Sequence, residues 1–443
     1  MTGFRLEEAT IDDLHQAIRD GRTTCVAVVQ QYIDRVRAYN GVSSMLVTLD
    51  GEKVADAPGV VRAGAPIRFP TQTVKASALL PDLDRYVGPP LEFGRMEPTA
   101  SDPSVSQQFG MIVGIPDAGQ VNALGTINIR GERSVTCRGE FDRHPSQGPL
   151  PPGAPLVCEM FRRQPDALER AAELDAAFGQ NPDLDAMPMY GVVFSFKDPF
   201  DTRDMRSTGG GDAAYDIDFP ARDHILIEQL RAKGAIIFAK AVNTEYNGRA
   251  GDPGGRHDPV AVLPSTLGYQ RSTWAGNPSN PYDTTRAASL GSSSGSALSV
   301  STNMVMISLG EETRASCRGP SNHNAVALLL PHKAMIGFDG GAIGADIYCD
   351  RTGIHARRIR DAAKVLDALK DPVDGYYDPR DPFTTVPRSS VLAGYAEHAA
   401  APGLLTGMRI GVIRESMLNA GMKHVEPITT AAAAEIKAVL VGG

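Results

Sequence analysis

One lysine and a Gly/Ser-rich segment carry residue types that could do acid–base chemistry. Lys197 directly follows the apolar run 191–196, so its amine is expected at the carboxyl end of a buried strand. Burial disfavours the charged form of a lysine, which makes a neutral amine, and therefore a base, available. Ser292 and Ser293 lie within residues 291–296, where closely spaced hydroxyls could pass on a proton or bind an anion.

A second polar segment, residues 310–320, places Ser316 in a turn that is expected to present several backbone N–H groups. Such a turn is the setting that an oxyanion hole requires. His323 and His332 do not belong to a metal-binding motif or a triad-like motif in the sequence, and we expect them to be structural or exposed. The chain also lacks the glycine-rich patterns of phosphate-binding and dinucleotide-binding loops.

Residues 291–295 match the Gly-x-Ser-x-Gly pattern of a nucleophile elbow, centred on Ser293. That elbow follows a buried strand, whereas the preceding residues 282–289 are polar. A conventional Ser-His-Asp hydrolase that uses Ser293 is therefore the least favoured interpretation.

Regular alternation of helices and strands begins near residue 163 and is typical of an α/β fold. The apolar periodicity and the capping residues predict a helix over 165–178, a strand over 190–196, a helix capped by Asp223, a strand over 235–239, a small-residue helix after 296, helical segments over 354–369 and 427–441, and a strand over 408–413. Residues 247–295 are rich in loop-forming residues.

Three segments follow from this pattern. Residues 1–51 are expected to form a helical hairpin packed on the core, with Thr10 and Thr24 as N-caps. Residues 52–162 are interpreted as a loop- and strand-rich insertion, and residues 163–443 as the α/β core. The chain stops where the alternation calls for another strand, so part of the core is expected to be missing.

The composition is that of an ordinary globular protein of 443 residues, with 42% hydrophobic and 22% charged residues. A net charge of −8 with mixed signs argues against nucleic-acid binding. No apolar run approaches the roughly 20 residues of a membrane span, and no signal peptide is recognisable, which favours the cytoplasm. The five cysteines are scattered, which indicates reduced thiols and no zinc site.

Taken together, segments 191–198, 291–297 and 310–320 resemble the hallmarks of the amidase signature family. These hallmarks are a strand ending in Lys-Asp, a Gly/Ser-rich loop whose serine has a cis peptide bond, and a Gly-Thr-Asp-x-Gly-Gly-Ser-Ile-Arg turn. The separation of 24 residues between Ser292 and Ser316 is typical of the family. The resemblance implies an α/β fold with a mixed, largely parallel central sheet flanked by helices on both faces.

The resemblance also implies a role for each site residue. Ser316 would be the nucleophile, with Ser292 as the relay and Lys197 as the base, in a serine amidohydrolase that cleaves a carboxylic amide without metal or cofactor. The register of the turn favours Ser316 over the adjacent Cys317. Because Lys197 must be neutral, activity is expected to rise on the alkaline side.

The turn departs from the family pattern just before the nucleophile. Arg314 and Ala315 stand where the family has paired glycines, so the oxyanion hole is expected to be altered, and Arg314 could attract an acidic substrate. Thr313, Arg314, Ala315 and Ser293 are the residues expected to contact the oxyanion or the substrate.

Glu312 replaces the usual aspartate and is expected to form a structural ion pair with Arg318. Two alternatives to the hydrolase stay open: a catalytically weakened, ligand-binding member, and an amidotransferase A-type subunit that supplies ammonia to a partner. The expected partners are a small-molecule amide substrate, a second copy in a homodimer, and a further chain or segment that completes the carboxyl-terminal part.

Overall fold

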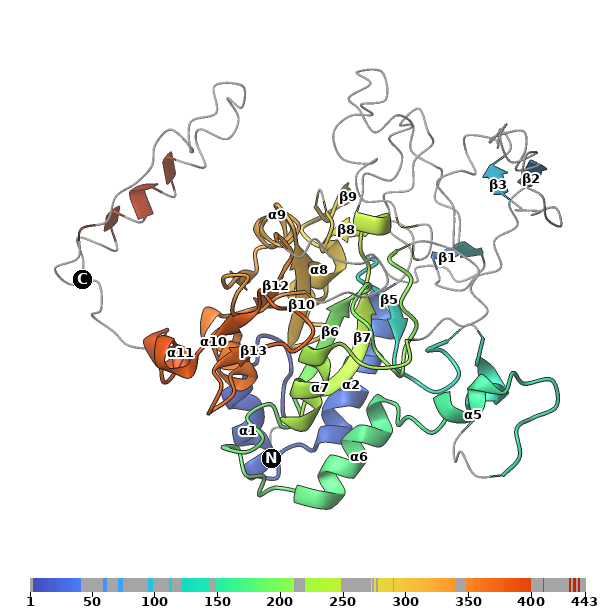
Figure 1. The fold of residues 1–443 in the computed structure, drawn as a ribbon, viewed down its shortest axis with the longest axis horizontal. Coiled ribbons are helices and arrows are strands. Elements are labelled where there is room, and N and C mark those ends of the chain that lie inside the picture. The colour runs from blue at the N-terminus through green and yellow to red at the C-terminus, as the bar shows by residue number, and fades with distance from the viewer. Residues whose placement is uncertain are drawn as a thin grey trace.

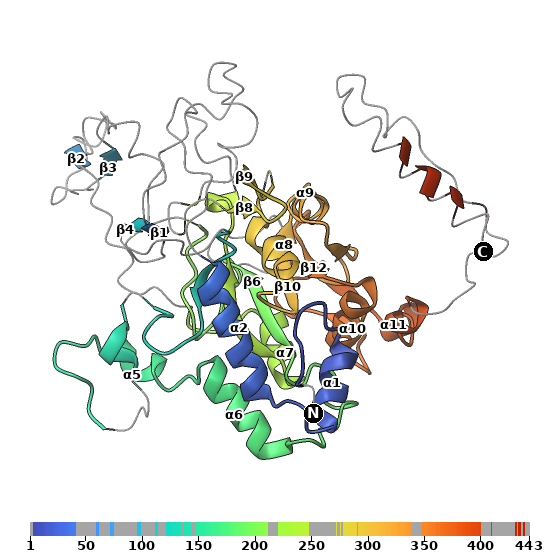
Figure 2. The same ribbon diagram turned by 180° about the vertical axis from the view of Figure 1, so that it is seen from behind.

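The computed structural model describes most of the chain outside several gaps (Figures 1 and 2). The described residues are 3–40, 59–61, 71–74, 95–98, 111–113, 121–134, 136–143, 148–210, 220–247, 278–289, 291–338 and 348–399, with positions 272, 275 and 409 and parts of 430–438.

The described α-helices are α1 (Ile11–Arg19), α2 (Cys25–Tyr39), α5 (Val157–Phe161), α6 (Ala167–Phe178), α7 (Ile225–Ala232), α8 (Ser294–Ser301), α9 (Arg318–His323), α10 (Ile359–Leu369) and α11 (Tyr395–His398). The described strands are β1 (Gly59–Val61), β2 (Thr71–Val74), β3 (Arg95–Pro98), β4 (Met111–Val113), β5 (Leu124–Ile127), β6 (Val193–Lys197), β7 (Ile236–Ala241), β8 (Ser279–Asn280), β9 (Asp283–Ala287), β10 (Ile307–Glu312), β11 (Ala327–Leu329), β12 (Arg351–Ala356), β13 (Tyr376–Tyr377) and β14 (Thr385–Val386).

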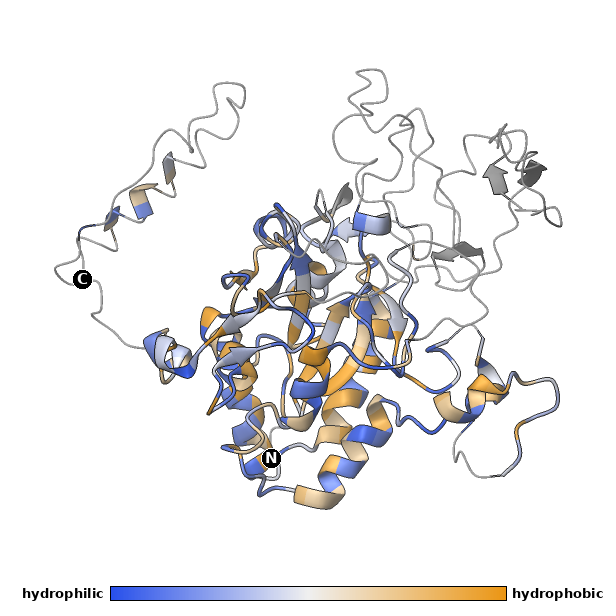
Figure 3. Ribbon diagram, viewed as in Figure 1, coloured by the Kyte–Doolittle hydropathy of each residue, from blue (hydrophilic) through white to orange (hydrophobic). Residues whose placement is uncertain are grey.

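A six-stranded mixed sheet forms the centre of the molecule, in the order β11-β12-β10-β6-β7-β5. The central strands β10, β6 and β7 run parallel, whereas β12, β11 and β5 pair antiparallel with their neighbours. The hydropathy colouring shows apolar residues concentrated along these strands and the helix faces that cover them (Figure 3). The predicted mixed α/β sheet with parallel central strands is therefore confirmed.

Alternating residues of β6 give the two faces of the sheet different characters. The hydroxyl of Ser195 lies 3.0 Å from that of Ser299 on α8, so Ser195 and Lys197 face the α8 side. Phe194 and Phe196 point to the other face, where aromatic contacts lead through Phe200 to the N-cap of α7. The aromatic face is a packed core, and the α8 face is polar.

Both helices predicted in residues 1–51 form, as α1 and α2. Thr10 caps α1 in a capping box with Asp13, and the hydroxyl of Thr24 accepts a hydrogen bond from the N–H of Ala27 at the start of α2. The carboxylate of Asp175 on α6 accepts hydrogen bonds from the first two N–H groups of α2, which joins α2 to α6.

Residues 124–127, which the sequence places in an insertion, form strand β5 of the central sheet. β5 pairs antiparallel with β7, and the N–H of Val242 donates to the carbonyl of Ala123 at 2.9 Å. This pairing joins segments more than 100 residues apart, and local sequence patterns do not predict it. The division into three segments is otherwise untested.

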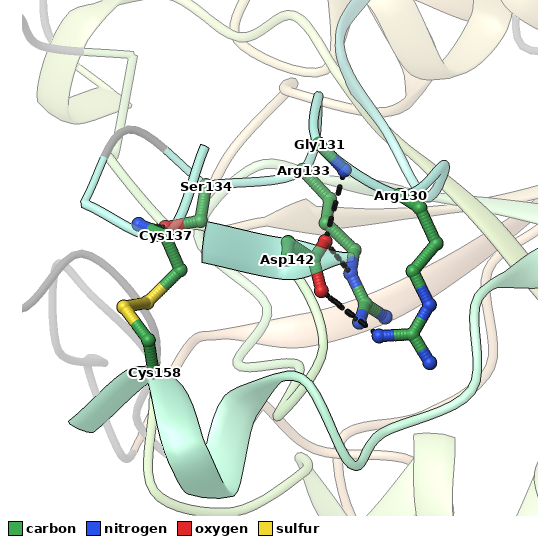
Figure 4. Close-up of a disulfide and its surroundings, with 7 residues drawn as sticks. All are labelled: Arg130, Gly131, Arg133, Ser134, Cys137, Asp142 and Cys158. Carbon is green, nitrogen blue, oxygen red and sulfur yellow. Dashed lines mark hydrogen bonds and ion pairs between the residues drawn. A yellow bond between two sulfur atoms is a disulfide. The ribbon is translucent and has the colours of Figure 1, made fainter. Parts of the chain in front are cut away.

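The expectation of reduced thiols is wrong for two of the five cysteines. Cys137 and Cys158 form a disulfide (Figure 4). Cys25, Cys317 and Cys349 are free. Scattered spacing gives no indication of which cysteines approach each other in the fold, and this pair is brought together by the chain around α5.

Three local predictions need correction. His224, and not Asp223, caps α7: its ring accepts from the N–H of Leu226, while Asp223 binds Arg231. The segment predicted as helical from residue 354 begins with strand β12, and the polar turn predicted from residue 310 begins with the end of β10. In both cases pairing in the sheet overrides a polar or helix-compatible sequence.

The predictions for residues 408–413 and for most of 247–277 and 427–441 lie outside the described residues. Within the described part of the chain, no helix combines the length and apolar character needed to cross a bilayer.

Candidate active site

Lys197 ends strand β6 and is fully buried on the polar face of the sheet. Its Nζ lies 2.7 Å from the Oγ of Ser292, 2.5 Å from Oε2 of Glu311 and 3.2 Å from the Glu311 carbonyl. The next residue, Asp198, turns the chain away by accepting the N–H groups of Thr208 and Gly209. The strand therefore delivers the amine to the serine loop.

Ser292 lies in the loop that leads into α8, and the peptide bond between Gly291 and Ser292 is cis. The carbonyl of Ser292 accepts from the N–H of Thr244 at 3.1 Å. Gly295, at the start of α8, packs against the chain that follows β7, because a Cβ at this position would clash with the backbones of Ala123 and Val242. A glycine is required here for close approach of the two backbones.

Ser316 lies half-buried in the turn between β10 and α9. The carboxylate of Glu312 holds this turn, since Oε2 accepts the N–H groups of Cys317 and Arg318. Oε1 pairs with Nε of Arg318 at 2.8 Å and with Arg351 on β12 at 3.2 Å. The predicted ion pair between Glu312 and Arg318 is confirmed, and it ties both ends of the turn together.

A backbone contact brings the two serine segments together. The N–H of Ser293 donates to the carbonyl of Ser316 at 3.0 Å, so a direct hydrogen bond joins the loop of Ser292 to the turn of Ser316. Among the described residues, no hydrogen bond joins the hydroxyls of Ser292 and Ser316. The structure thus assembles Lys197 with Ser292 directly, and Ser316 beside them through the backbone.

Ser293 and Cys317 point into the interior. The hydroxyl of Ser293 is fully buried and donates to the carbonyl of Glu311 at 3.0 Å, which does not fit its expected contact with a substrate through the side chain. Burial raises the pKa of the Cys317 thiol to about 12, so this cysteine is a poor nucleophile at neutral pH. The half-buried Ser316 is the better candidate.

The remaining residues expected around the oxyanion lie on the turn. Thr313 is half-buried, and its hydroxyl approaches Asp350 at 2.5 Å and Glu311 at 3.2 Å. Arg314 and Ala315 are exposed. The described residues include no group of three or more His, Cys, Asp or Glu side chains placed to hold a metal ion.

Glu311 is the residue at this site that the sequence did not single out. It is 1% exposed and contacts Lys197, although 114 residues separate the two. The signal was present in the turn motif, where the family pattern has threonine at the position of Glu311. His355 on β12 is also buried nearby, and burial lowers its pKa to about 3, with a smaller contribution from Lys197.

Comparisons with known proteins identify the family of this chain. A family model described as Amidase matches residues 155–440, which include all three candidate catalytic residues. The chain belongs to the amidase family.

Among relatives, the chain is 30% identical to a probable amidase of Arabidopsis thaliana over 260 residues, covering 58% of this chain and 47% of that protein. It is 27% identical to the A-type subunit of the glutamyl-tRNA(Gln) amidotransferase of Koribacter versatilis over 249 residues, covering 56% of this chain and 45% of that one. The peptide amidase structure from Stenotrophomonas maltophilia matches with a TM-score of 0.40 and 28% identity, over 53% of this chain and 42% of that chain. The chain spans about half the length of these curated relatives.

Proposed function

We propose that this amidase-family chain is a serine amidohydrolase that cleaves a carboxylic amide to a carboxylate and ammonia or an amine. One observation carries the proposal: the buried amine of Lys197 lies 2.7 Å from the Ser292 hydroxyl, and the loop of Ser292 is bonded to that of Ser316. A lysine, a relay hydroxyl and a more accessible serine are the parts that a nucleophile without histidine needs.

In the proposed reaction, the Oγ of Ser316 attacks the amide carbon while its proton passes to Ser292 and the proton of Ser292 passes to neutral Lys197. The C–N bond then breaks, and the relay returns the proton to the leaving nitrogen. Water hydrolyses the resulting ester on Ser316 by the same relay. The backbone N–H groups of the turn at 313–316 are the proposed donors to the oxyanion.

The test is covalent labelling with a fluorophosphonate, followed by intact mass. We expect one adduct on the native chain, none on Ser316→Ala, and much slower labelling of Lys197→Met. A Ser293→Ala variant that is folded but unlabelled, together with a labelled Ser316→Ala variant, would overturn the assignment of the nucleophile.

We propose a class of substrates and not a single amide. Linear amides outside peptide bonds are the expected class, and Arg314, exposed beside Ser316, favours substrates with a negative charge. A panel of neutral and acidic amides tests this point, because Arg314→Ala should lower kcat/KM for acidic members and leave neutral ones unchanged.

An amidotransferase component is the second candidate, and the matches to the A-type subunits of several glutamyl-tRNA(Gln) amidotransferases support it. This function predicts a stable complex with a second chain and little hydrolysis of simple amides alone. Copurification from the native source, with the stoichiometry measured by mass, separates the two candidates.

The cytoplasm is the location proposed from the sequence. The disulfide between Cys137 and Cys158 argues against it, because disulfides persist mainly in oxidising compartments. Intact mass of the protein isolated under thiol-blocking conditions, without reductant, decides whether the native protein carries the bond.

A further inference from the structure

Lys240 on β7 is a fully buried lysine that the proposed reaction does not use. Its Nζ donates to the carbonyl of Asp198 at 2.9 Å, to the hydroxyl of Ser207 at 2.6 Å and to the carbonyl of Phe200. All three acceptors are neutral, and they come from one stretch of chain, residues 198–207. Because burying a lysine is costly unless its amine is hydrogen-bonded, these contacts indicate that the amine holds this stretch in place.

Lys240 and Lys197 lie on opposite faces of the sheet. In the register of β6 and β7, Lys240 lies beside Phe196, which points to the aromatic face. Lys197 follows Phe196 in the chain and faces the α8 side. The hydrogen bonds of Lys240 in the described part of the chain do not include Ser292 or Ser316, so an effect of Lys240 on the reaction has to pass through the backbone.

The stretch that Lys240 contacts is closed into a loop over residues 198–209. Oδ1 of Asp198 accepts the N–H groups of Thr208 at 2.5 Å and of Gly209 at 2.7 Å, which joins the beginning of the loop to its end. The amine of Lys240 therefore bonds to both arms of a loop that begins directly after the proposed base.

The loop in turn supports segment 243–247. The carbonyl of Gly209 accepts from the N–H of Tyr246 at 2.7 Å and from the side-chain amide of Asn243 at 3.1 Å. Tyr246 and the following Asn247 both have left-handed backbone angles, with φ of 48° and 56°. Residues with a side chain keep this conformation only where the surrounding structure holds them, and the Gly209 carbonyl supplies part of that hold.

Two contacts from this segment reach the neighbours of the Lys197 amine. The N–H of Thr244 donates to the carbonyl of Ser292 at 3.1 Å, and the side-chain amide of Asn247 donates to Oε2 of Glu311 at 2.7 Å. The Nζ of Lys197 lies 2.7 Å from the Ser292 hydroxyl and 2.5 Å from the same Glu311 oxygen. A continuous set of hydrogen bonds thus leads from one buried lysine to the other.

We propose that Lys240 is a positioning residue for the amide cleavage: it fixes the loop 198–209 and, through it, the placement of Ser292 and Glu311 around Lys197. The inference rests on the proposed function, in which Ser292 and Lys197 pass on the proton. Proton transfer requires donor and acceptor within hydrogen-bonding distance, so a loosened loop slows the reaction although every group that takes part in it is still present.

A double-mutant cycle tests this role through the rate of fluorophosphonate labelling of Ser316. Lys240→Met keeps most of the side-chain volume, loses the donors, and should slow labelling by about tenfold or more. In the Lys197→Met background the same substitution should change the slow residual rate by less than about threefold, because its effect passes through Lys197. Equal slowing in both backgrounds, or labelling of Lys240→Met at the native rate, would overturn the inference.

Lys370→Met is the matched control, because the amine of Lys370 also holds two backbone carbonyls, those of Leu392 at 2.9 Å and Ala393 at 2.7 Å. These lie outside the path between the two lysines, so the labelling rate should stay within a few-fold of native. If urea unfolding shows that Lys240→Met is not folded, Ser207→Ala takes its place, since it removes one acceptor and keeps the amine. It should slow labelling by about threefold or more in the native background only, and an unchanged rate would contradict the proposed role.

Hydrogen exchange separates this inference from the proposed function. In folded Lys240→Met, the backbone amides of residues 198–209 and 243–247 should exchange faster than in the native chain, and in Lys370→Met they should not. Unchanged exchange in both segments of Lys240→Met would also overturn the inference. If the native chain does not label, or if Lys197→Met labels at the native rate, the proposed function fails, and exchange in these segments alone decides whether Lys240 holds them.

Discussion

Two buried ion pairs in the described part of this chain differ in what the cation can do. Arg133 and Asp142 are both fully buried and bonded twice, Nε to Oδ2 at 2.7 Å and Nη2 to Oδ1 at 2.8 Å. Asp142 also accepts from Arg130 and from the N–H of Gly131 (Figure 4). Lys197 and Glu311 are equally buried, but Lys197 also faces a hydroxyl.

The comparison separates a structural pair from a reactive one. A guanidinium stays protonated and presents a rigid fork that matches a carboxylate, so Arg133 can only hold the chain in place. An amine can give up and take back a proton, so Lys197 can exchange one with the hydroxyl beside it. Burial is the same in both pairs, and the difference lies in the chemistry of the cation.

The largest expected effect is that of Lys197→Arg, which makes the reactive pair resemble the structural one. The guanidinium keeps the positive charge beside Glu311 but cannot accept a proton, so labelling of Ser316 should slow by about 10²- to 10⁴-fold. A time course of intact mass measures the rate, and the urea unfolding midpoint shows whether the variant is folded. Labelling within a few-fold of the native rate would show that Lys197 is not the base.

Breaking the structural pair should instead affect stability. Arg133→Met leaves Asp142 buried without its main partner and should lower the free energy of unfolding by about 3–5 kcal/mol. Arg133→Lys keeps the charge, loses the fork, and should cost less. Urea unfolding measures both, and the labelling rate of the folded variants should remain within a few-fold of native.

The disulfide beside the structural pair closes a loop over a sequence separation of 21 residues. Replacing Cys137 and Cys158 by serine should lower the free energy of unfolding by about 3 kcal/mol, because the unfolded chain regains the entropy of the open loop. Urea unfolding with and without reductant tests this. If reductant does not change the midpoint of the native protein, the bond contributes nothing to its stability.

Acid should destabilise the folded chain through three buried histidines. Burial lowers the pKa of His15 to about 4 and those of His224 and His355 to about 3. The unfolded chain protonates these rings near pH 6.5, so it binds more protons than the folded chain below that pH. The free energy of unfolding should therefore fall as pH drops from about 6.5 towards 4.

His224→Asn provides the matched control for the acid effect, because asparagine can still cap α7 but does not titrate in this range. Its unfolding free energy should vary less steeply with pH than that of the native chain. An identical slope would mean that His224 is not held neutral.

The smallest effect concerns the thiol beside the proposed nucleophile. Cys317 has its pKa raised to about 12 by burial, and Cys25 is buried as well, whereas Cys349 is exposed. Brief treatment of the folded protein with iodoacetamide near pH 7 should therefore modify Cys349 and leave Ser316 labelling unchanged. Peptide mapping locates the adduct, and rapid alkylation of Cys317 would reopen the choice of nucleophile.

Local patterns carried most of what the sequence predicted. The caps Thr10 and Thr24 and the buried strands before Lys197 and after Gly234 are encoded within a few residues, so periodicity and capping were enough to find them. The resemblance to the amidase signature family paired Ser292 with Ser316, and the loops of these two serines do meet.

Periodicity and capping do not predict contacts between residues far apart in the sequence. The disulfide between Cys137 and Cys158 and the pairing of β5 with β7 join residues with no shared local signal. The position of Glu311 beside Lys197 has no local signal either. Its importance depends on a partner 114 residues away, which only the folded chain identifies.

The pairing of β5 with β7 limits where a fragment containing the region matched by the family model can begin. The matched region begins at residue 155, yet β5, at residues 124–127, covers the edge of the parallel strands. A fragment that starts at 155 would expose the unpaired N–H and C=O groups of β7, a surface on which strands of other molecules add. The boundary of sequence similarity is therefore not a boundary of cooperative folding, and a soluble, monomeric unit has to begin before residue 121.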